Sequence, residues 1–192
     1  MMKFNDLLAL LRLSVLDPEQ GGRAVMALNP PMSVRWMVLA LAVVGAVLFQ
    51  FVPLVLSGQT EGMVSPLWPT LAQGAMNLAI VLLITLVGRA AGGKGSFPDA
   101  LLLVGWLQSI SLIFMAVLLV AGIFGPGVEL PVIVGSILLT IWMIVGFICA
   151  VHGFQSKGLV LVGSILVLVL FSMVLSLILM MLGFAPMGVG DV

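Results

Sequence analysis

The sequence predicts an all-α integral membrane protein, a five-span transmembrane helix bundle preceded by one or two amphipathic helices. Hydrophobic residues make up 62% of the 192-residue chain, which has only seven basic and seven acidic residues. Soluble domains carry roughly 25% charged residues, so this chain cannot build an ordinary soluble surface. The composition therefore excludes a soluble enzyme, a nucleic-acid-binding protein and a disordered chain.

Residues 1–33 are too polar to span a membrane. Their apolar side chains recur at helical spacing, at Phe4, Leu7, Leu8, Leu11 and Val15. This spacing predicts an amphipathic helix that either lies in the membrane interface or packs on the protein's own cytoplasmic face.

A second short helix is expected from residue 18 to about residue 28. Asp17 can accept hydrogen bonds from the helix start, Pro18 suits the first helical position, and Gln20 follows the cap by three residues. Pro30 and Pro31 end this segment with a stiff joint into the membrane.

Five apolar blocks follow, with charged residues only near their ends. About 20 apolar residues cross the hydrocarbon core, and backbone groups in lipid must be bonded within the chain, so these blocks are expected to be helices. We expect residues 34–183 to form the transmembrane domain and residues 184–192 to form a short tail outside. The predicted spans are about 34–56, 71–91, 100–124, 131–151 and 159–182.

The basic residues predict the orientation. Cytoplasmic loops collect Lys and Arg, and an N-terminus inside the cell makes every basic residue cytoplasmic. We therefore expect a bacterial inner-membrane protein with a cytoplasmic N-terminus and a periplasmic C-terminus. The residues that carry this prediction are Lys3, Arg12, Arg23, Arg35, Arg89, Lys94 and Lys157.

The glycine-rich loop between the second and third spans is the most distinctive segment. It differs from a nucleotide-binding P-loop because Gly95 stands where a Ser or Thr must hold Mg²⁺, so we predict no nucleotide. One interpretation is a structural turn, since glycine tolerates positive φ and Ser96, Pro98 and Asp99 can start the third span. The other is a cytoplasmic interaction loop that touches anionic headgroups or a partner. Its candidate residues are Arg89, Gly92, Gly93, Lys94, Gly95, Ser96, Phe97 and Asp99.

Cys149 and His152 are three residues apart at the cytoplasmic end of the fourth span, and Lys157 follows them. They could form a thiol–imidazole pair or two metal ligands. Catalysis also needs an orienting group and a metal site needs more ligands, and the sequence supplies neither. We therefore interpret Cys149 as a packing residue and His152 and Lys157 as interfacial, and we predict no cofactor and no enzyme.

Polar and small residues inside the spans predict how the helices pack. Asn77 and Gln108 are candidates for a polar path through the bundle, although the favoured interpretation of the polar residues in the spans is hydrogen bonding between packed helices. Small residues four positions apart allow helices to approach closely. Such pairs are Ala42/Ala46, Ala75/Ala79, Gly105/Ser109, Gly146/Ala150 and Ser172/Ser176.

From residue 17 to residue 182 the chain resembles the Yip family (Ypt-interacting proteins) of multi-pass membrane proteins, in its short bacterial form. The resemblance depends on the segment Gly92–Ala100 and on Trp142, followed by His152-Gly153 and Lys157. It implies five spans and a cytoplasmic N-terminus. Eukaryotic members of the family work in vesicle trafficking with small Rab-type GTPases and by pairing with related proteins. Before its first span this chain shows no long hydrophilic region on which a GTPase could dock. Its third span also reads Gly105–Ser109 at a place where many members have an aromatic residue followed by Pro.

The sequence as a whole favours a non-enzymatic membrane protein that acts through protein or lipid interaction, as a scaffold, assembly factor or accessory subunit. Its expected partners are membrane lipids and either another membrane protein or a second copy, with no nucleic acid. The alternative is a channel or transporter component lined by Asn77 and Gln108. A membrane enzyme that uses Cys149 or His152 is a third hypothesis.

Overall fold

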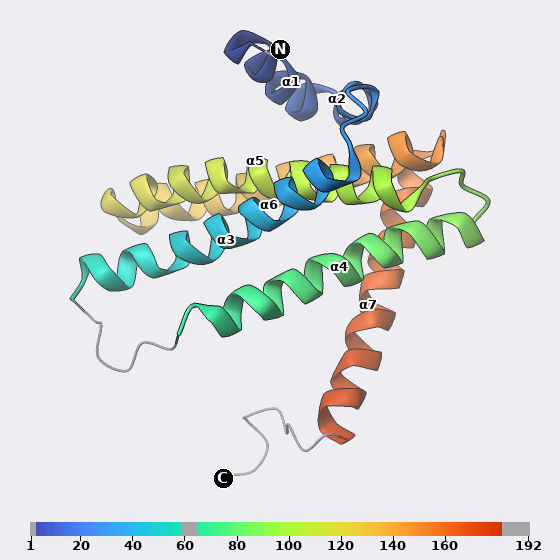
Figure 1. Ribbon diagram of the computed structural model, residues 1–192. Coiled ribbons are helices and arrows are strands. Elements are labelled where there is room, and N and C mark those ends of the chain that lie inside the picture. The colour runs from blue at the N-terminus through green and yellow to red at the C-terminus, as the bar shows by residue number, and fades with distance from the viewer. Residues whose placement is uncertain (1–2, 59–64, 182–192) are drawn as a thin grey trace. The chain divides into compact units, whose positions relative to one another are not determined.

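The computed structural model describes residues 3–58 and 65–181, and in these ranges the chain forms helices and no strands (Figure 1). This confirms the all-α fold class. The helices are α1 (Phe4–Leu16), α2 (Pro18–Ala27), α3 (Met32–Leu56), α4 (Leu67–Ala90), α5 (Phe97–Ile123), α6 (Pro126–His152) and α7 (Lys157–Met181).

Five of these helices are long and apolar enough to cross a membrane, namely α3, α4, α5, α6 and residues Lys157–Ile178 of α7. The helices extend up to five residues beyond the predicted apolar blocks because their first turns include residues that the apolar pattern leaves out. Pro98 and Pro126, for example, lie in the first turns of α5 and α6, where proline needs no backbone N–H partner. The predicted tail at residues 184–192 lies outside the described residues.

The chain divides into two compact units, Met1–Gln155 and Ser156–Val192. Helix α7 belongs to the second unit and carries apolar side chains along its whole length. In the first unit α3, α4, α5 and α6 run side by side (Figure 1). We call the end where α3 and α5 begin and α4 and α6 finish the glycine-loop end, and the opposite end the distal end.

Helix α5 is the centre of the first unit because it is apolar all round. One of its faces contributes Leu102, Leu103 and Ile110 to a cluster with α2 and α6. Another face contributes Leu101 and Val104 to a cluster with α3 and α4. A helix that buries both faces fixes the relative positions of all its neighbours.

The N-terminal helices pack closely on this bundle. A Cβ built on Gly146 of α6 would lie 2.5 Å from Cγ of Pro18, and one built on Gly22 of α2 would lie 3.0 Å from Cβ of Ala150. The Trp106 indole N–H donates to the buried hydroxyl of Ser14 at 2.9 Å. Helices α1 and α2 are therefore held by the protein's own α5 and α6.

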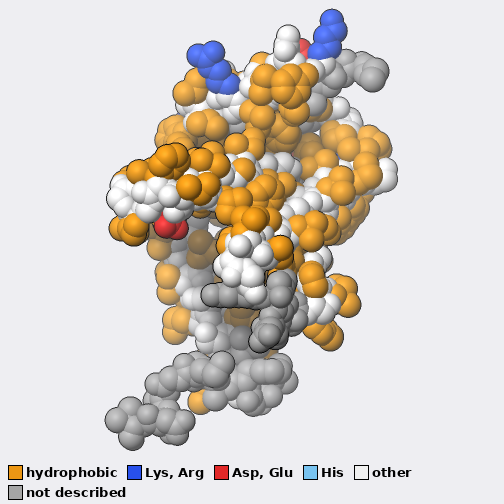
Figure 2. Space-filling view, turned by 90° about the vertical axis from the view of Figure 1, so that its left-hand side faces the viewer, with side chains coloured by type: hydrophobic (Ala, Val, Ile, Leu, Met, Phe, Trp, Pro, Cys, Tyr) orange, Lys and Arg blue, Asp and Glu red, His pale blue; other side chains and the backbone are white. Residues whose placement is uncertain are grey.

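Hydrophobic side chains cover most of the surface seen in Figure 2, and Lys and Arg gather at its top, over α1 and α2. Exposed large apolar residues occur on every long helix. A soluble protein rarely exposes so much contiguous apolar surface, whereas lipid-facing helices require it.

Candidate functional site

The predicted interaction loop begins with a glycine-dependent helix end. Gly92 follows α4 with φ of +87°, a conformation that L side chains rarely adopt. The Gly93 N–H donates to Gly88 O at 2.8 Å and the Gly92 N–H donates to Arg89 O at 2.9 Å. These two bonds form a Schellman motif, which satisfies carbonyls that the helix end leaves open.

The loop ends at a capped start of α5, as the sequence predicts. The Ser96 hydroxyl accepts from the Asp99 N–H at 3.3 Å and donates to the Asp99 carboxylate at 2.5 Å. Pro98 occupies the first turn, and the Asp99 carboxylate lies near the positive end of the helix dipole. The loop is therefore fixed at both of its ends by local interactions.

His152 at the end of α6 joins this loop from across the bundle. Its Nδ1 accepts from the Gly95 N–H at 3.1 Å, and its Nε2 lies 2.9 Å from the Ile84 carbonyl. Because Nδ1 accepts, Nε2 must carry the proton and donate it, so the ring is neutral. The Lys94 N–H also donates to the His152 carbonyl at 3.3 Å. His152 thus connects α4, the loop and α6.

Three glycines make room for this imidazole. A Cβ on Gly88 would lie 2.2 Å from Nε2, one on Gly93 would lie 2.4 Å from Nδ1, and one on Gly95 would lie 2.5 Å from Cε1 of His152. Real side chains do not approach so closely, so any larger residue must displace the ring. Gly88, Gly93 and Gly95 are therefore needed for space, whereas Gly92 is needed for its positive φ.

The two basic side chains of the loop are exposed. The Arg89 Nε donates to the Gly95 carbonyl at 2.8 Å, which closes the loop on itself. Lys94 is held only through its backbone, and its ammonium extends from a fixed main chain. Phe97 packs beside Trp36 with ring centroids 6.1 Å apart.

Arg35 anchors the start of α3 to the start of α5. Its guanidinium donates to Asp99 Oδ1 at 3.0 Å, to the Pro30 carbonyl at 2.9 Å and to Asn29 Oδ1 at 2.9 Å. The side chain is buried, and the planar fork of arginine suits three acceptors held at fixed positions. In the sequence Arg35 is only one of the basic residues that predict the orientation, and these three contacts are not predicted from it. Asn29, which accepts one of the bonds, has a φ of +41° in the structure.

The ring nitrogens of His152 are bonded to backbone groups of Gly95 and Ile84, so they are not available to Cys149 as a base. Cys149 itself is buried. Among the described residues no group of three or more His, Cys, Asp or Glu side chains could hold a metal ion. Lys157 begins α7, in the second unit.

Asn77 and Gln108 are brought together by the bundle. The Gln108 side-chain amide donates to Asn77 Oδ1 across α4 and α5, and Asn77 Nδ2 donates to the Gln73 carbonyl at 2.9 Å. Asn77 is almost fully buried. The two amides therefore satisfy each other inside the packed helices, in a bond that joins residues 31 positions apart.

A family model described as the Yip1 domain matches residues 13–183. The chain belongs to the Yip1 domain family. This confirms the resemblance seen in the sequence, and the chain is a multi-pass membrane protein. Comparisons with curated proteins and with solved structures gave no match.

The whole glycine loop and His152 lie within the matched Yip1 domain. The arrangement in this domain is a latch: an imidazole from one helix fills a socket made by glycines of another segment. Glycines carry no side chain and leave no charge or periodicity to read, so the sequence gives little sign of this contact. A lone histidine at the same membrane face as a glycine-rich loop was the available signal.

Proposed function

We propose that this Yip1 domain chain is a non-enzymatic scaffold or accessory subunit of the bacterial inner membrane, and that its glycine loop binds an acidic surface of a partner protein. The observation that carries the proposal is the latch between His152 and the loop. It holds Arg89 and Lys94 on a main chain fixed by hydrogen bonds at Gly93, Lys94 and Gly95. A loop fixed before binding loses little conformational entropy on binding, which favours recognition.

The chemistry of the loop supports recognition over catalysis. Both nitrogens of the single histidine bind backbone groups, and the nearby carboxylate of Asp99 binds Arg35 and Ser96. The exposed charged groups of the loop are the cations of Arg89 and Lys94. Cations at the rim of a surface speed association with acidic partners and select them.

A photocrosslinking amino acid at Ala91, exposed beside Gly92, tests this proposal in cells. We expect a discrete protein adduct whose yield falls at least fivefold when Lys94→Glu is added. The matched control carries the same crosslinker at Val128, an exposed residue of the distal end. Identical adducts at both positions, or an Ala91 adduct insensitive to Lys94→Glu, would contradict a charge-specific loop.

The orientation belongs to the same proposal and is supported by the placement of the basic residues, with a cytoplasmic N-terminus and a periplasmic C-terminus. Cys149 is buried, so we expect the native cysteine to react little with the reagent, and single cysteines can be introduced at other positions. In intact cells a membrane-impermeant thiol reagent should label Val128→Cys and spare Lys94→Cys. The reverse labelling would place the loop in the periplasm and remove the proposal's cytoplasmic partner.

The alternative function, a channel or transporter component, requires a path past Asn77 and Gln108. Their side chains bind each other, and this contact favours a packing role. Liposomes containing the chain should show no solute flux above empty liposomes. Flux that disappears in Asn77→Leu and Gln108→Leu would favour transport.

A further inference from the structure

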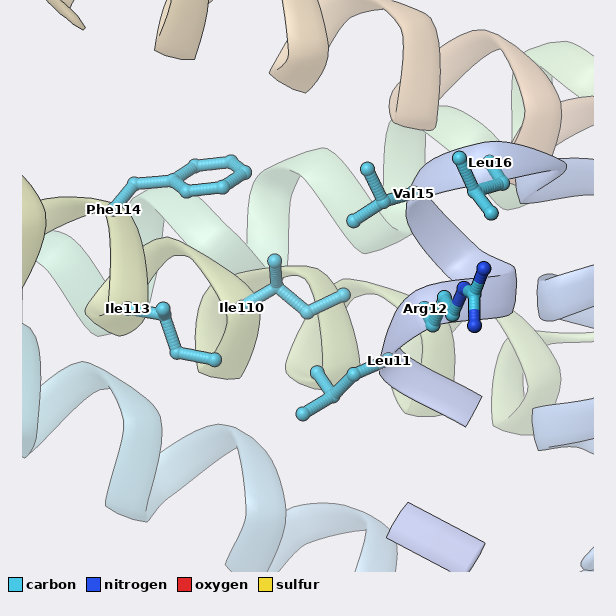
Figure 3. A pocket seen from close by; sticks show the side chains of 7 residues that line it. All are labelled: Leu11, Arg12, Val15, Leu16, Ile110, Ile113 and Phe114. Carbon is cyan, nitrogen blue, oxygen red and sulfur yellow. The ribbon is translucent and has the colours of Figure 1, made fainter. Parts of the chain in front are cut away.

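A hollow of about 380 Å³ opens between α1 and α5 (Figure 3). Phe114 and Val15 point toward each other across it, with Ile110 and Leu11 below them in this view. Its apolar walls are formed by Leu11, Val15 and Leu16 of α1 and by Ile110, Ile113 and Phe114 of α5. The volume is within the usual range for pockets that hold a small molecule.

Arg12 is the single charged residue of this lining. It is exposed, and within residues 3–58 and 65–181 its guanidinium takes part in neither an ion pair nor a hydrogen bond. The carboxylates of Asp6, Glu19 and Asp99 bind Lys3 N, Arg23 and Arg35 respectively. Asp17, five residues after Arg12, accepts from Gln20. The hollow therefore joins an apolar slot to a cation that forms no ion pair within the described residues.

The hollow lies beside the middle of a candidate membrane span. At 1.5 Å per residue, Ile110 is about 20 Å along α5 from Phe97. Leu16 and Ile113 are 66% and 47% exposed, so the slot is open at the surface of the first unit. A guanidinium beside hydrocarbon is costly unless an anion or water reaches it.

We propose that the hollow binds one anionic diacyl phospholipid, with an acyl chain between Val15 and Phe114 and the headgroup phosphate on the Arg12 guanidinium. A phospholipid supplies both groups that the site requires, because its chain fills apolar space and its phosphate forms charge-assisted hydrogen bonds with arginine. The site is formed by α1 and α5 and excludes the glycine loop, so it does not depend on the proposed partner protein.

Native mass spectrometry of the full-length chain in mild detergent tests the proposal. The chain is incubated with equal amounts of phosphatidylglycerol and phosphatidylethanolamine, and retained lipids are counted. We expect one retained phosphatidylglycerol, with retention at least fivefold lower in Arg12→Gln and phosphatidylethanolamine unchanged. Arg23→Gln, which removes a cation outside the hollow, should stay within twofold of the wild type. Inorganic phosphate should not compete.

A second pair of variants tests the apolar slot. Ile113→Trp should fill the hollow from its exposed side and reduce phosphatidylglycerol retention at least fivefold while Arg12 remains. Thermal unfolding checks that the variant folds, and Leu16→Trp at the opposite wall provides the same test if Ile113→Trp is unstable. Unchanged retention in a folded filling variant would overturn the site.

Phosphatidylglycerol with a photoactivatable acyl chain locates the lipid. We expect crosslinks to peptides that contain residues 11–16 and 110–114. Equal losses in Arg12→Gln and Arg23→Gln would show general attraction to cations and overturn a specific site. Lipid crosslinks confined to α7 would also overturn the site. Protein–protein crosslinks from the lining residues to α7 or to a second copy of the chain would overturn it too, because another part of the protein would then occupy the hollow.

Discussion

The two ends of the α3–α6 bundle use glycine differently. At the glycine-loop end, Gly88, Gly93 and Gly95 lie so close to His152 that a methyl group on any of them would overlap the ring. At the distal end there is nothing within 4 Å of the Cβ position of Gly58, Gly74, Gly125 or Gly127. Glycine therefore provides space for His152 at the glycine-loop end in addition to positive φ at Gly92 and Gly153, whereas at the distal end Gly58 and Gly125 provide positive φ without such a close neighbour.

Polar contacts follow the same division. The glycine-loop end has the three acceptors of Arg35 and the two ring bonds of His152. The distal end has the exposed bond between the side chains of Gln50 and Gln73, at 3.3 Å. The contrast teaches that, among the described residues, the side-chain hydrogen bonds between distant segments are more numerous where the loop presents cations than at the other end.

His152→Ala should produce the largest effect. It leaves the buried Gly95 N–H without its acceptor and opens a cavity among the three glycines. An unsatisfied buried group costs about 1–3 kcal/mol and the cavity adds to this, so we expect a loss of roughly 3–4 kcal/mol. Unfolding of the full-length chain in detergent measures it. A loss below about 1 kcal/mol would show that His152 does not hold the loop.

Gly88→Ala should have the next largest effect, and α4 offers its own control. The added methyl group overlaps His152, and such overpacking costs about 1–3 kcal/mol. Gly74→Ala on the same helix has open space and should be neutral or slightly stabilising.

A double-mutant cycle identifies the cause of the Gly88→Ala loss. With His152→Ala already present, Gly88→Ala should cost less than about 1 kcal/mol because the ring that it overlaps is absent. Equal costs for Gly88→Ala and Gly74→Ala in the wild-type chain would remove the distinction between the two ends.

Arg35→Lys should have an intermediate effect. Lysine keeps the positive charge but lacks the planar guanidinium that donates to Pro30, Asn29 and Asp99 at once. We expect the free energy of unfolding to fall by about 1–2 kcal/mol. The ion pair itself contributes little, since Asp99 is partly exposed to solvent screening. Proteolysis between α2 and α3 should become faster in this variant. A stability equal to that of the wild type would show that charge alone suffices.

Gln50→Leu should have the smallest effect. It removes the distal bond to Gln73, and hydrogen bonds between membrane helices contribute roughly 0.6 kcal/mol on average. We expect a change in unfolding free energy below about 0.6 kcal/mol. A loss as large as that of Arg35→Lys would show that the distal end is held as firmly as the glycine-loop end.

Local patterns in the sequence predict the parts of this fold that local forces determine. The five apolar blocks become helices, and the start of α5 is capped by Ser96 and Asp99 as expected. Asp17 accepts from the Gln20 N–H at 3.2 Å and starts α2. Caps and spans follow from neighbours in the chain, so one sequence is enough to place them.

Contacts between distant segments are not encoded in such patterns. The pair Gly146/Ala150 predicts a close helix approach, yet the approaching helix is the short α2 and not another span. His152 is separated by 57 residues from Gly95, whose missing side chain gives no signal. Asn77 and Gln108 could each be selected as polar residues in a span, but their mutual bond depends on the packing of α4 against α5.

The latch also sets an order for building the protein. The loop between α4 and α5 receives its last hydrogen bonds from the final residue of α6, 57 residues later than Gly95. At about 5–20 residues per second, translation needs roughly 3–11 seconds to cover that interval. During this time the Gly95 N–H must be bonded to water or to another protein. A nascent chain that stops before α6 therefore carries an open socket where the imidazole will later lie.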